Sequence, residues 1–250
     1  VAIPGFPLPY APVHYPFHGI QSTVSGVGVN VAKALHRLGH SVQLHSLIGP
    51  DLAGDTVIAA LEQTGISTHG ISRILSATPQ SVILYDPAGR RQIQVDLKEC
   101  QQTPLPTGYE QVLQQCELAI LCNINFSRAL LDTAKRLNKR IACDVHVLWD
   151  IDDDYNRDFM AAADILFLSD EGLDGRNAES FIRALAQRYQ NQLIIMGCGS
   201  RGALLYQSAQ DEFFHAPAIA PRGIINTIGA GDALFSAFIH EWLQHGDPQL

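Results

Sequence analysis

The stretch LAILCNINFSRALLDTAKRLNKRIACD, residues 118–144, decides the fold class of this chain. It opens with a short apolar run, continues with apolar residues at helical spacing over 127–138, and closes with a second apolar run over 140–144. The alternation then repeats as a helix near 155–162, a strand over 163–169, a helix over 178–190 and a strand over 192–196. Strands that alternate with helices indicate right-handed βαβ units. We therefore expect an α/β fold with a mostly parallel central sheet and helices on both faces.

The flanking regions contain further helices and strands, together with two pieces that break the alternation. The expected elements are a helix over 31–38 ending at Gly39, a strand over 41–48, a helix over 53–64 ending at Gly65, a hairpin over 203–216 and a final helix over 233–244. Residues 1–24 are rich in proline and aromatic side chains, and residues 80–97 have the pattern of a β-hairpin. We expect these two pieces to lie together as a small sheet beside a single domain.

Composition limits the class of protein. Of the 250 residues, 46% are hydrophobic and 17% are charged, which excludes a disordered chain. The formal net charge of −8 disfavours binding to nucleic acid or to an anionic membrane, since both need clustered Lys and Arg. No apolar run approaches the roughly 18 residues that span a bilayer, and the five cysteines form no C-x-x-C pair. We therefore predict a cytoplasmic protein with reduced thiols and a small-molecule partner.

The strongest chemical signal is the run NTIGAGD, residues 226–232, which opens the last helix. Gly229 and Gly231 let the backbone approach a ligand closely, and the first amides of a helix point outward at the positive end of its dipole. Such an end binds an anion such as a terminal phosphate. Asp232 has the position of a base that accepts the proton of an attacking hydroxyl. The alternative is a glycine-rich turn in which Asp232 only caps the helix.

Two further glycine-rich runs are open to more than one interpretation. The run GCGSRG, residues 197–202, matches the dinucleotide fingerprint G-x-G-x-x-G, but a strand-like segment follows where that fingerprint needs a helix. A tight turn between strands is therefore favoured there. The run SGVGVN, residues 25–30, precedes a helix. It forms either a backbone-lined pocket, in which the Asn30 amide bonds a substrate hydroxyl, or simply the start of that helix.

Metal candidates are few. Asp170 and Glu171 come just after a predicted strand, and Asp144 ends another, so all three are expected at the edge where ligands of parallel sheets collect. The histidines are scattered and do not suggest a zinc site. The chain contains neither a P-loop motif nor the G-x-S-x-G motif of α/β-hydrolases.

Taken together, three stretches resemble the ribokinase-like (PfkB) carbohydrate kinase family. Residues 226–232, followed by ALFSAF, are similar to the family's second signature, a D/N-T-x-G-A-G-D run with small residues after it. Residues 26–55 resemble its first conserved region, which ends in a G-x-D-x-x-G piece, here at 49–54. Residues 199–206 resemble the segment before the adenine pocket. The order and spacing agree with the family, so the resemblance covers nearly the whole chain.

The resemblance implies a ribokinase-like three-layer sandwich with a small β-sheet lid formed by residues 1–24 and 80–97. It implies ATP-dependent phosphorylation of a sugar or nucleoside hydroxyl, with Mg²⁺. The implied site residues are Asp232 as the base; Gly229, Ala230 and Gly231 as the anion hole; Ser25, Gly26 and Asn30 at the substrate; and Thr227, Gly199 and Gly202 at the nucleotide. The edges of an exposed lid sheet also offer a surface for a homodimer.

The chain departs from the family pattern in two respects. It starts after the family's first strand and ends soon after the catalytic helix, so it is expected to be truncated at both ends. In place of the family's N-x-x-E motif it has SDEG, residues 169–172, and Asp170 or Glu171 is expected to serve the metal through water. These departures keep two rivals open. One is a catalytically weakened homologue that senses a sugar or nucleotide, and the other is a dinucleotide-dependent oxidoreductase.

Overall fold

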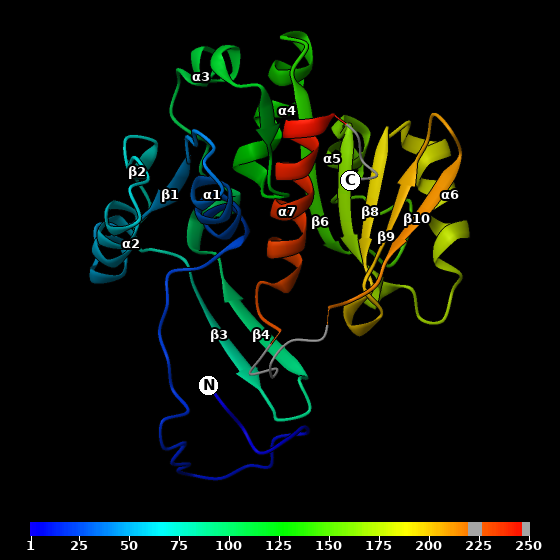
Figure 1. Cartoon of the computed structure of the whole chain (residues 1–250). Helices are drawn as coiled ribbons and strands as arrows, with labels where there is room; N and C mark the ends of the chain where they lie inside the picture. The colour runs from blue at the N-terminus through cyan, green and yellow to red at the C-terminus, as the bar shows by residue number, and fades with distance from the viewer. Residues whose placement is uncertain (220–226, 247–250) are drawn as a thin grey trace.

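A six-stranded sheet forms the centre of the computed structural model, which describes residues 1–219 and 227–246 (Figure 1). Its strands lie in the order β10-β9-β8-β7-β6-β5. Their bounds are β5 (Leu118–Ile120), β6 (Arg140–Val147), β7 (Ile165–Ser169), β8 (Leu193–Gly197), β9 (Ala203–Gln207) and β10 (Glu212–Ala216). β5 to β8 are parallel, whereas β9 is antiparallel to both of its neighbours. The predicted α/β fold with a mostly parallel sheet is confirmed.

Helices cover both faces of this sheet, and the side chains of β7 show how. Ile165 and Phe167 pack against α1 (Val27–Arg37) and α7 (Ala230–His245) on one face. The alternate residues, Leu166 and Leu168, pack on the opposite face. That face is covered by α4 (Asn125–Arg136), α5 (Arg157–Ala162) and α6 (Ala178–Tyr189). Because all four β7 side chains are buried, this strand is apolar throughout, as a strand inside a parallel sheet should be.

The N-terminal half adds a smaller parallel pair of strands. β1 (Ser46–Ile48) pairs with β2 (Ile71–Arg73), and α2 (Leu52–Gln63) connects them. β1 is shorter than the strand expected over 41–48. α3 (Tyr109–Gln115) was not predicted from the sequence, because YEQVLQQ has too few apolar residues to show a helical period.

A two-stranded hairpin projects from the body beside the N-terminal segment (Figure 1). β3 (Gln80–Tyr85) pairs with β4 (Arg91–Asp96), and the carboxylate of Asp86 closes the turn by accepting bonds from Arg90. The N-terminal segment joins the hairpin, since the Val1 ammonium donates to the Ile83 carbonyl at 2.6 Å and Ala2 forms a bridge with Tyr85. The two β-rich pieces of the sequence therefore lie together.

The hairpin joins the body at two places, which we call its roots: the first lies just before β3, at Thr78, and the second just after β4, at residues 98–101. The first root is held by the segment GPDLAG, residues 49–54. The Asp51 carboxylate caps α2 through Gly54 N at 2.8 Å, and it also accepts from the Thr78 amide at 2.8 Å and the Thr78 hydroxyl at 2.6 Å. These bonds hold the chain two residues before β3. They lower the pKa of Asp51 to about 2, with the Thr78 hydroxyl as the largest cause. The backbone is so close here that a Cβ on Gly49 would lie 2.5 Å from the Ala77 backbone.

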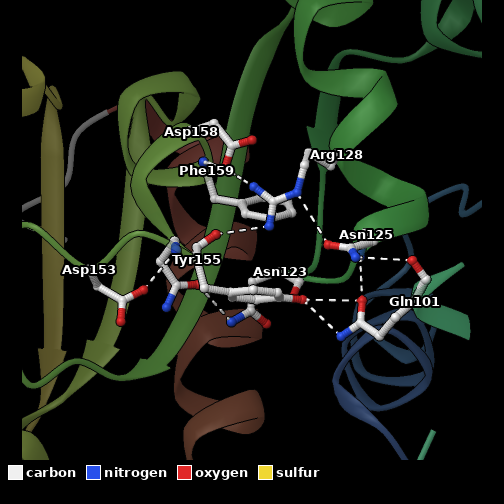
Figure 2. A network of polar contacts seen from close by, with 9 residues as sticks. Gln101, Asn123, Asn125, Arg128, Asp153, Tyr155, Asp158 and Phe159 are labelled. Carbon is white, nitrogen blue, oxygen red and sulfur yellow. Dashed lines mark hydrogen bonds and ion pairs between the residues drawn. The ribbon is translucent and has the colours of Figure 1, made fainter.

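The second root is fixed by a polar network (Figure 2). β4 is followed by a short 3-10 helix, Lys98–Gln101. The Gln101 carbonyl accepts from the Asn125 amide at 3.0 Å, and its side chain contacts the Tyr155 hydroxyl. Arg128 completes the network by donating to the Tyr155 carbonyl and pairing with Asp158. The hairpin is thus hydrogen-bonded to the body at both of its roots, while its turn lies at the far end.

Candidate active site

The amino end of α7 carries the run that the sequence analysis singled out. Gly229 is the N-cap residue in the left-handed conformation, with φ of 76°, which favours glycine. Asp232 lies in the first turn and is partly buried. Buried apolar residues further along the same helix (Phe235, Ile239 and Trp242) hold it against the sheet. The turn is therefore fixed in position. The Ala230 amide donates to the Thr227 carbonyl at 3.3 Å, and the amides that follow lie at the end of the helix that favours an anion. Asn226, the first residue of the run, lies outside the described residues.

A hydrogen bond joins this turn to α1. The Asn30 amide nitrogen donates to Asp232 Oδ2 at 2.6 Å, and the Ser25 hydroxyl lies 3.1 Å from the same amide nitrogen. The contact spans 202 positions of sequence, and the packing of Val31 and Leu35 of α1 in the same apolar cluster as α7 brings the two residues together. Asn30, expected at the substrate, therefore orients the predicted base. Its own position is fixed because it lies in the first turn of α1, after Gly26.

A buried carboxyl group lies in the same region. Asp144, on β6, is 4% exposed, and burial raises its pKa; the neighbouring Asp232 adds to the rise and His146 opposes it. His146 donates its amide to Asp144 at 2.8 Å and has a φ of 58°, where the register of β6 shifts. Burial, together with Asp144 and Asp232, raises the pKa of the Cys122 thiol to about 12. Cys122 is thus protonated at neutral pH and is no nucleophile.

Arginine side chains hold both predicted metal ligands. Arg91, at the start of β4, has Nη2 3.3 Å from Glu171 Oε1, and its Nη1 donates to the Thr227 hydroxyl at 2.8 Å. Arg201 pairs with Asp170. Within residues 1–219 and 227–246, no group of three or more His, Cys, Asp or Glu side chains could hold a metal ion. A cation at Asp170 or Glu171 would therefore keep water or phosphate oxygens as most of its ligands, as Mg²⁺ commonly does.

The run 197–202 forms a turn between antiparallel strands. A short 3-10 helix, Gly199–Arg201, connects β8 to β9, and no α-helix follows. A Cβ on Gly202 would lie 2.0 Å from the Ala216 carbonyl, so packing requires glycine there. The dinucleotide interpretation is therefore wrong, because that fingerprint needs a helix whose amino end faces the pyrophosphate. The turn remains a candidate for a nucleotide edge, since Arg201 connects it to Asp170 beside the site.

The structure brings several of the predicted residues into contact with one another. Contacts link Ser25, Asn30 and Asp232 in one group, and Thr227, Glu171 and Arg91 in another. Sequence reasoning missed Arg91, because a hairpin pattern does not say what its side chains reach. None of the helices in the described part of the chain combines the length and apolarity needed to cross a bilayer.

A carboxylate in the first turn of a helix, with a side-chain amide from a second helix beside it, is an arrangement that suits proton acceptance next to a bound anion. The chain matches the model of the pfkB family of carbohydrate kinases over residues 7–249 and belongs to that family. It is accordingly an enzyme of the kinase class, with an alcohol group as acceptor, and the family implies that it uses ATP. The predicted family and enzyme class are confirmed.

Relatives with known roles support this assignment. The chain is 25% identical over 237 residues to a deoxyribokinase of Salmonella typhi, covering 89% of this chain and 75% of that one. It is 24% identical over 245 residues to a 5-dehydro-2-deoxygluconokinase of Clostridium tetani, covering 87% and 71%. Among solved structures, a microbiome-derived acarbose kinase has a TM-score of 0.85 at 25% identity, covering 99% and 82%. The Arabidopsis thaliana ribokinase bound to ribose and ATP, with 17% identity, a TM-score of 0.76 and coverage of 98% and 82%, shows the ribokinase-like fold alone.

Proposed function

We propose that this kinase transfers the terminal phosphoryl group of ATP to a hydroxyl of a sugar or nucleoside, with Asp232 as the general base. The observation that carries the proposal is the position of Asp232. It lies in the first turn of α7, three residues after the left-handed Gly229, and the Asn30 amide orients its carboxylate at 2.6 Å. A carboxylate that only capped the helix would need no such partner from another helix.

The proposed step is a direct displacement. The acceptor oxygen attacks the terminal phosphorus as its proton passes to Asp232, and the bond between that phosphorus and the bridging oxygen of ADP breaks. Negative charge grows on the phosphoryl oxygens, and the amides of Gly229, Ala230 and Gly231 are the donors that would stabilise it. Positioning and electrostatics supply most of the rate in such reactions. Asn30 would hold the carboxylate in line with the acceptor hydroxyl.

The nucleotide would lie between α7 and the turn after β8. Thr227, Gly199 and Gly202 are the candidates for contacts with it. The positive φ of Gly199 and Gly229 fits a backbone that approaches a ligand closely. Asp170 and Glu171 would hold Mg²⁺ through water. When bound, such an ion would supply positive charge that offsets part of the negative charge on the phosphates.

Of the two classes of acceptor, we propose a sugar in preference to a nucleoside. The curated relatives compared above are named for deoxyribose and 5-dehydro-2-deoxygluconate, and the acarbose kinase for a larger sugar. The hairpin β3–β4 together with residues 1–24 would be the lid over this acceptor. Closure of a lid excludes water, which otherwise competes as an acceptor. The cytoplasmic location stays a prediction.

A binding protein without catalysis is the second candidate. The pairing of Asp170 with Arg201, and of Glu171 with Arg91, favours it, because both predicted metal ligands already have cationic partners. The Asn30–Asp232 bond opposes it, since a pure sensor has no need for an oriented base.

The test is release of ADP from Mg²⁺ and ATP across a panel of sugars and nucleosides. We expect wild type to respond to one acceptor class. The Asp232→Asn variant should release ADP about 10²–10⁴-fold more slowly than wild type. ATP should still raise the melting temperature of this variant. Asp132→Asn, at an exposed position on α4, is the matched control and should keep the wild-type rate. Full turnover by Asp232→Asn would refute the role of the base. No release with any acceptor, while ATP or a sugar still raises the melting temperature, would favour the sensor.

A further inference from the structure

The hydroxyl of Tyr155 links the second root of the hairpin to the central sheet (Figure 2). It accepts a hydrogen bond from Gln101 Nε2 at 3.0 Å, and Gln101 ends the short 3-10 helix that follows β4. It donates a hydrogen bond to the Asn123 carbonyl at 2.9 Å, shortly after β5. One phenol therefore joins the hairpin to the carboxyl end of a strand in the body.

Arg128 of α4 sets the position of this phenol. Its guanidinium lies over the Tyr155 ring, 4.9 Å from the ring centre, and its Nη2 donates to the Tyr155 carbonyl at 2.8 Å. The same guanidinium lies 4.6 Å from the centre of the buried Phe159 ring and pairs with Asp158. Since both the face of the ring and the backbone of Tyr155 are held, the hydroxyl has a fixed direction. Tyr155 therefore belongs to the body and acts on the hairpin from there.

The strand end that Tyr155 binds packs against the candidate active site. Asn123 directly follows Cys122, and a Cβ on Gly28, in the first turn of α1, would lie 3.5 Å from Cys122 Sγ. The same turn carries Asn30, the partner of the proposed base. The bonds of Tyr155 thus connect the hairpin to the part of the body that holds the acceptor-facing residues.

The hairpin needs this connection, because two strands alone have little stability in water. At the second root, Gln101 also bonds to Asn125. Its carbonyl accepts from Asn125 Nδ2 at 3.0 Å, and its Oε1 accepts from the Asn125 amide at 3.1 Å. The Tyr155 hydroxyl holds the other end of the same carboxamide, so it fixes which way the carboxamide faces. Loss of the hydroxyl would free the carboxamide to turn and would weaken both side-chain bonds of this root.

We propose that Tyr155 is a positioning residue that holds the hairpin over the acceptor and so determines how tightly the acceptor binds. The inference rests on the proposed function, because that function makes the hairpin the lid. When the root loosens, the hairpin spends less time in the binding position, and the apparent affinity for the acceptor falls by that fraction. The nucleotide is proposed to lie between α7 and the turn after β8, away from this root, so its affinity changes little.

Hydrogen exchange of the protein without ligands, followed by mass spectrometry, tests the hold on the hairpin directly. We expect Tyr155→Phe to speed exchange over residues 80–101 about five- to tenfold, as loss of one hydrogen bond does, with unchanged rates over residues 193–207. Tyr206→Phe is the matched control, because it loses a hydroxyl bond of 2.9 Å to Asp211 and should leave the hairpin unchanged. Unchanged exchange in the hairpin of Tyr155→Phe, or equally faster exchange along the whole chain, would overturn the proposal.

Turnover gives the second readout, with the acceptor that ADP release identifies. Tyr155→Phe should raise KM for the acceptor about five- to tenfold and leave KM for ATP within about twofold. Gln101→Leu should have the same effect, and the double variant should be no worse than the single variants, because all three lose one link. Equal changes in the two KM values, no change in either, or additive effects would contradict the proposal. If wild type phosphorylates no acceptor, the proposed function fails, and hydrogen exchange still decides whether Tyr155 holds the hairpin.

Discussion

At the scale of single residues, the account depends on the bond between Asn30 and Asp232. The two side chains meet at 2.6 Å although 202 positions separate them, so α1 supplies the amide and α7 the carboxylate that we propose as the base. A carboxylate held by an amide keeps one oxygen directed and leaves the other for a substrate proton. This division explains why Asn30 is useful at the site even if it makes no contact with the sugar.

Two substitutions of Asn30 test its contact with Asp232. Asn30→Ala removes the orienting donor and should lower kcat about tenfold or more, with little change in KM for ATP, because misplacement of a catalytic group affects the transition state. Asn30→Asp places a second carboxylate beside Asp232, and like charges disfavour the ionised base. The acidic limb of the pH–rate profile of Asn30→Asp should therefore move to higher pH. An unchanged profile in Asn30→Asp would mean that the two side chains are not neighbours in the working enzyme.

At the scale of elements, backbone crowding explains the glycines of the segment 49–54. Gly54 lies near the start of α2, and a Cβ there would lie 2.3 Å from the Gly49 carbonyl. Gly28 also lies in the first turn of a helix, α1, where the atom nearest to an added Cβ, Cys122 Sγ, would be 3.5 Å away. The two glycines therefore share a place in the first turn of a helix but have different surroundings.

We therefore predict opposite results for two alanine substitutions. Gly54→Ala should lower the free energy of unfolding by about 1–3 kcal/mol, the usual cost of overpacking. Gly28→Ala should leave it within about 1 kcal/mol of wild type, because alanine favours helices and meets only ordinary contacts there. Denaturation in urea measures both. Equal effects of the two substitutions would show that the crowding around Gly54 relaxes at no cost.

The cap of α2 predicts how stability depends on pH. Hydrogen bonds lower the pKa of Asp51 from 3.8 to about 2, so the folded protein favours the ionised carboxylate. The contribution of Asp51 is therefore complete above the unfolded value and is lost as pH falls through 4 toward 2. Asp51→Ala should melt several degrees below wild type at pH 7, and the gap between the two proteins should narrow between pH 4 and pH 2. The exposed Asp132→Ala is the control and should show no such narrowing.

Much of the architecture at this scale was predictable from the sequence, and its limits have physical causes. The alternation over residues 118–196 gave the βαβ order because apolar spacing directly reflects which side chains face the core. α3 was missed because only two of its seven residues, Val112 and Leu113, are aliphatic. From the sequence, the run 197–202 fitted either a dinucleotide fingerprint or a tight turn between strands. The structure shows the turn, because a strand and not a helix follows the run.

The site was predictable only in part. Gly229 and Asp232 are close in sequence, so their common location follows from one helix start. The partners that complete the site come from other elements. Asn30 reaches Asp232 through the packing of two helices, and Arg91 reaches Thr227 through a hairpin held at both roots. No local pattern encodes contacts of this kind, because they depend on how whole elements pack.

At the scale of the whole molecule, the proposed lid, formed by the hairpin β3–β4 and residues 1–24, leaves apolar side chains uncovered. Val82, Ile93 and Val95 on the hairpin are each about half exposed, and Tyr10 and Phe17 on the N-terminal segment are almost fully exposed. The outer edge of β4 is also free of any further strand among the described residues, and the outer edge of β3 is paired only at its end, by residues 1–3. Open edges beside apolar surface are suited to pairing with another copy of the chain.

We predict that the protein is a dimer formed through the lid. Ile93 and Val95 share the face of the hairpin that carries Arg91, and Val82 lies on the other face. Val95→Lys should shift the mass measured by light scattering from twice the chain mass of 27.3 kDa to a single copy. Val82→Lys, on the opposite face, is the matched control and should remain dimeric. A wild-type protein that is monomeric at all concentrations tested would remove this interface.

We propose that the phosphoryl group goes to a hydroxyl of a small molecule, with Asp232 as the base. ³¹P NMR of the products that form from ATP, Mg²⁺ and the acceptor identified by ADP release tests this transfer most directly. The account predicts a new phosphomonoester resonance that grows in step with ADP in wild type and does not appear with Asp232→Asn. Inorganic phosphate as the only new species, or a phosphomonoester formed equally well by Asp232→Asn, would contradict it.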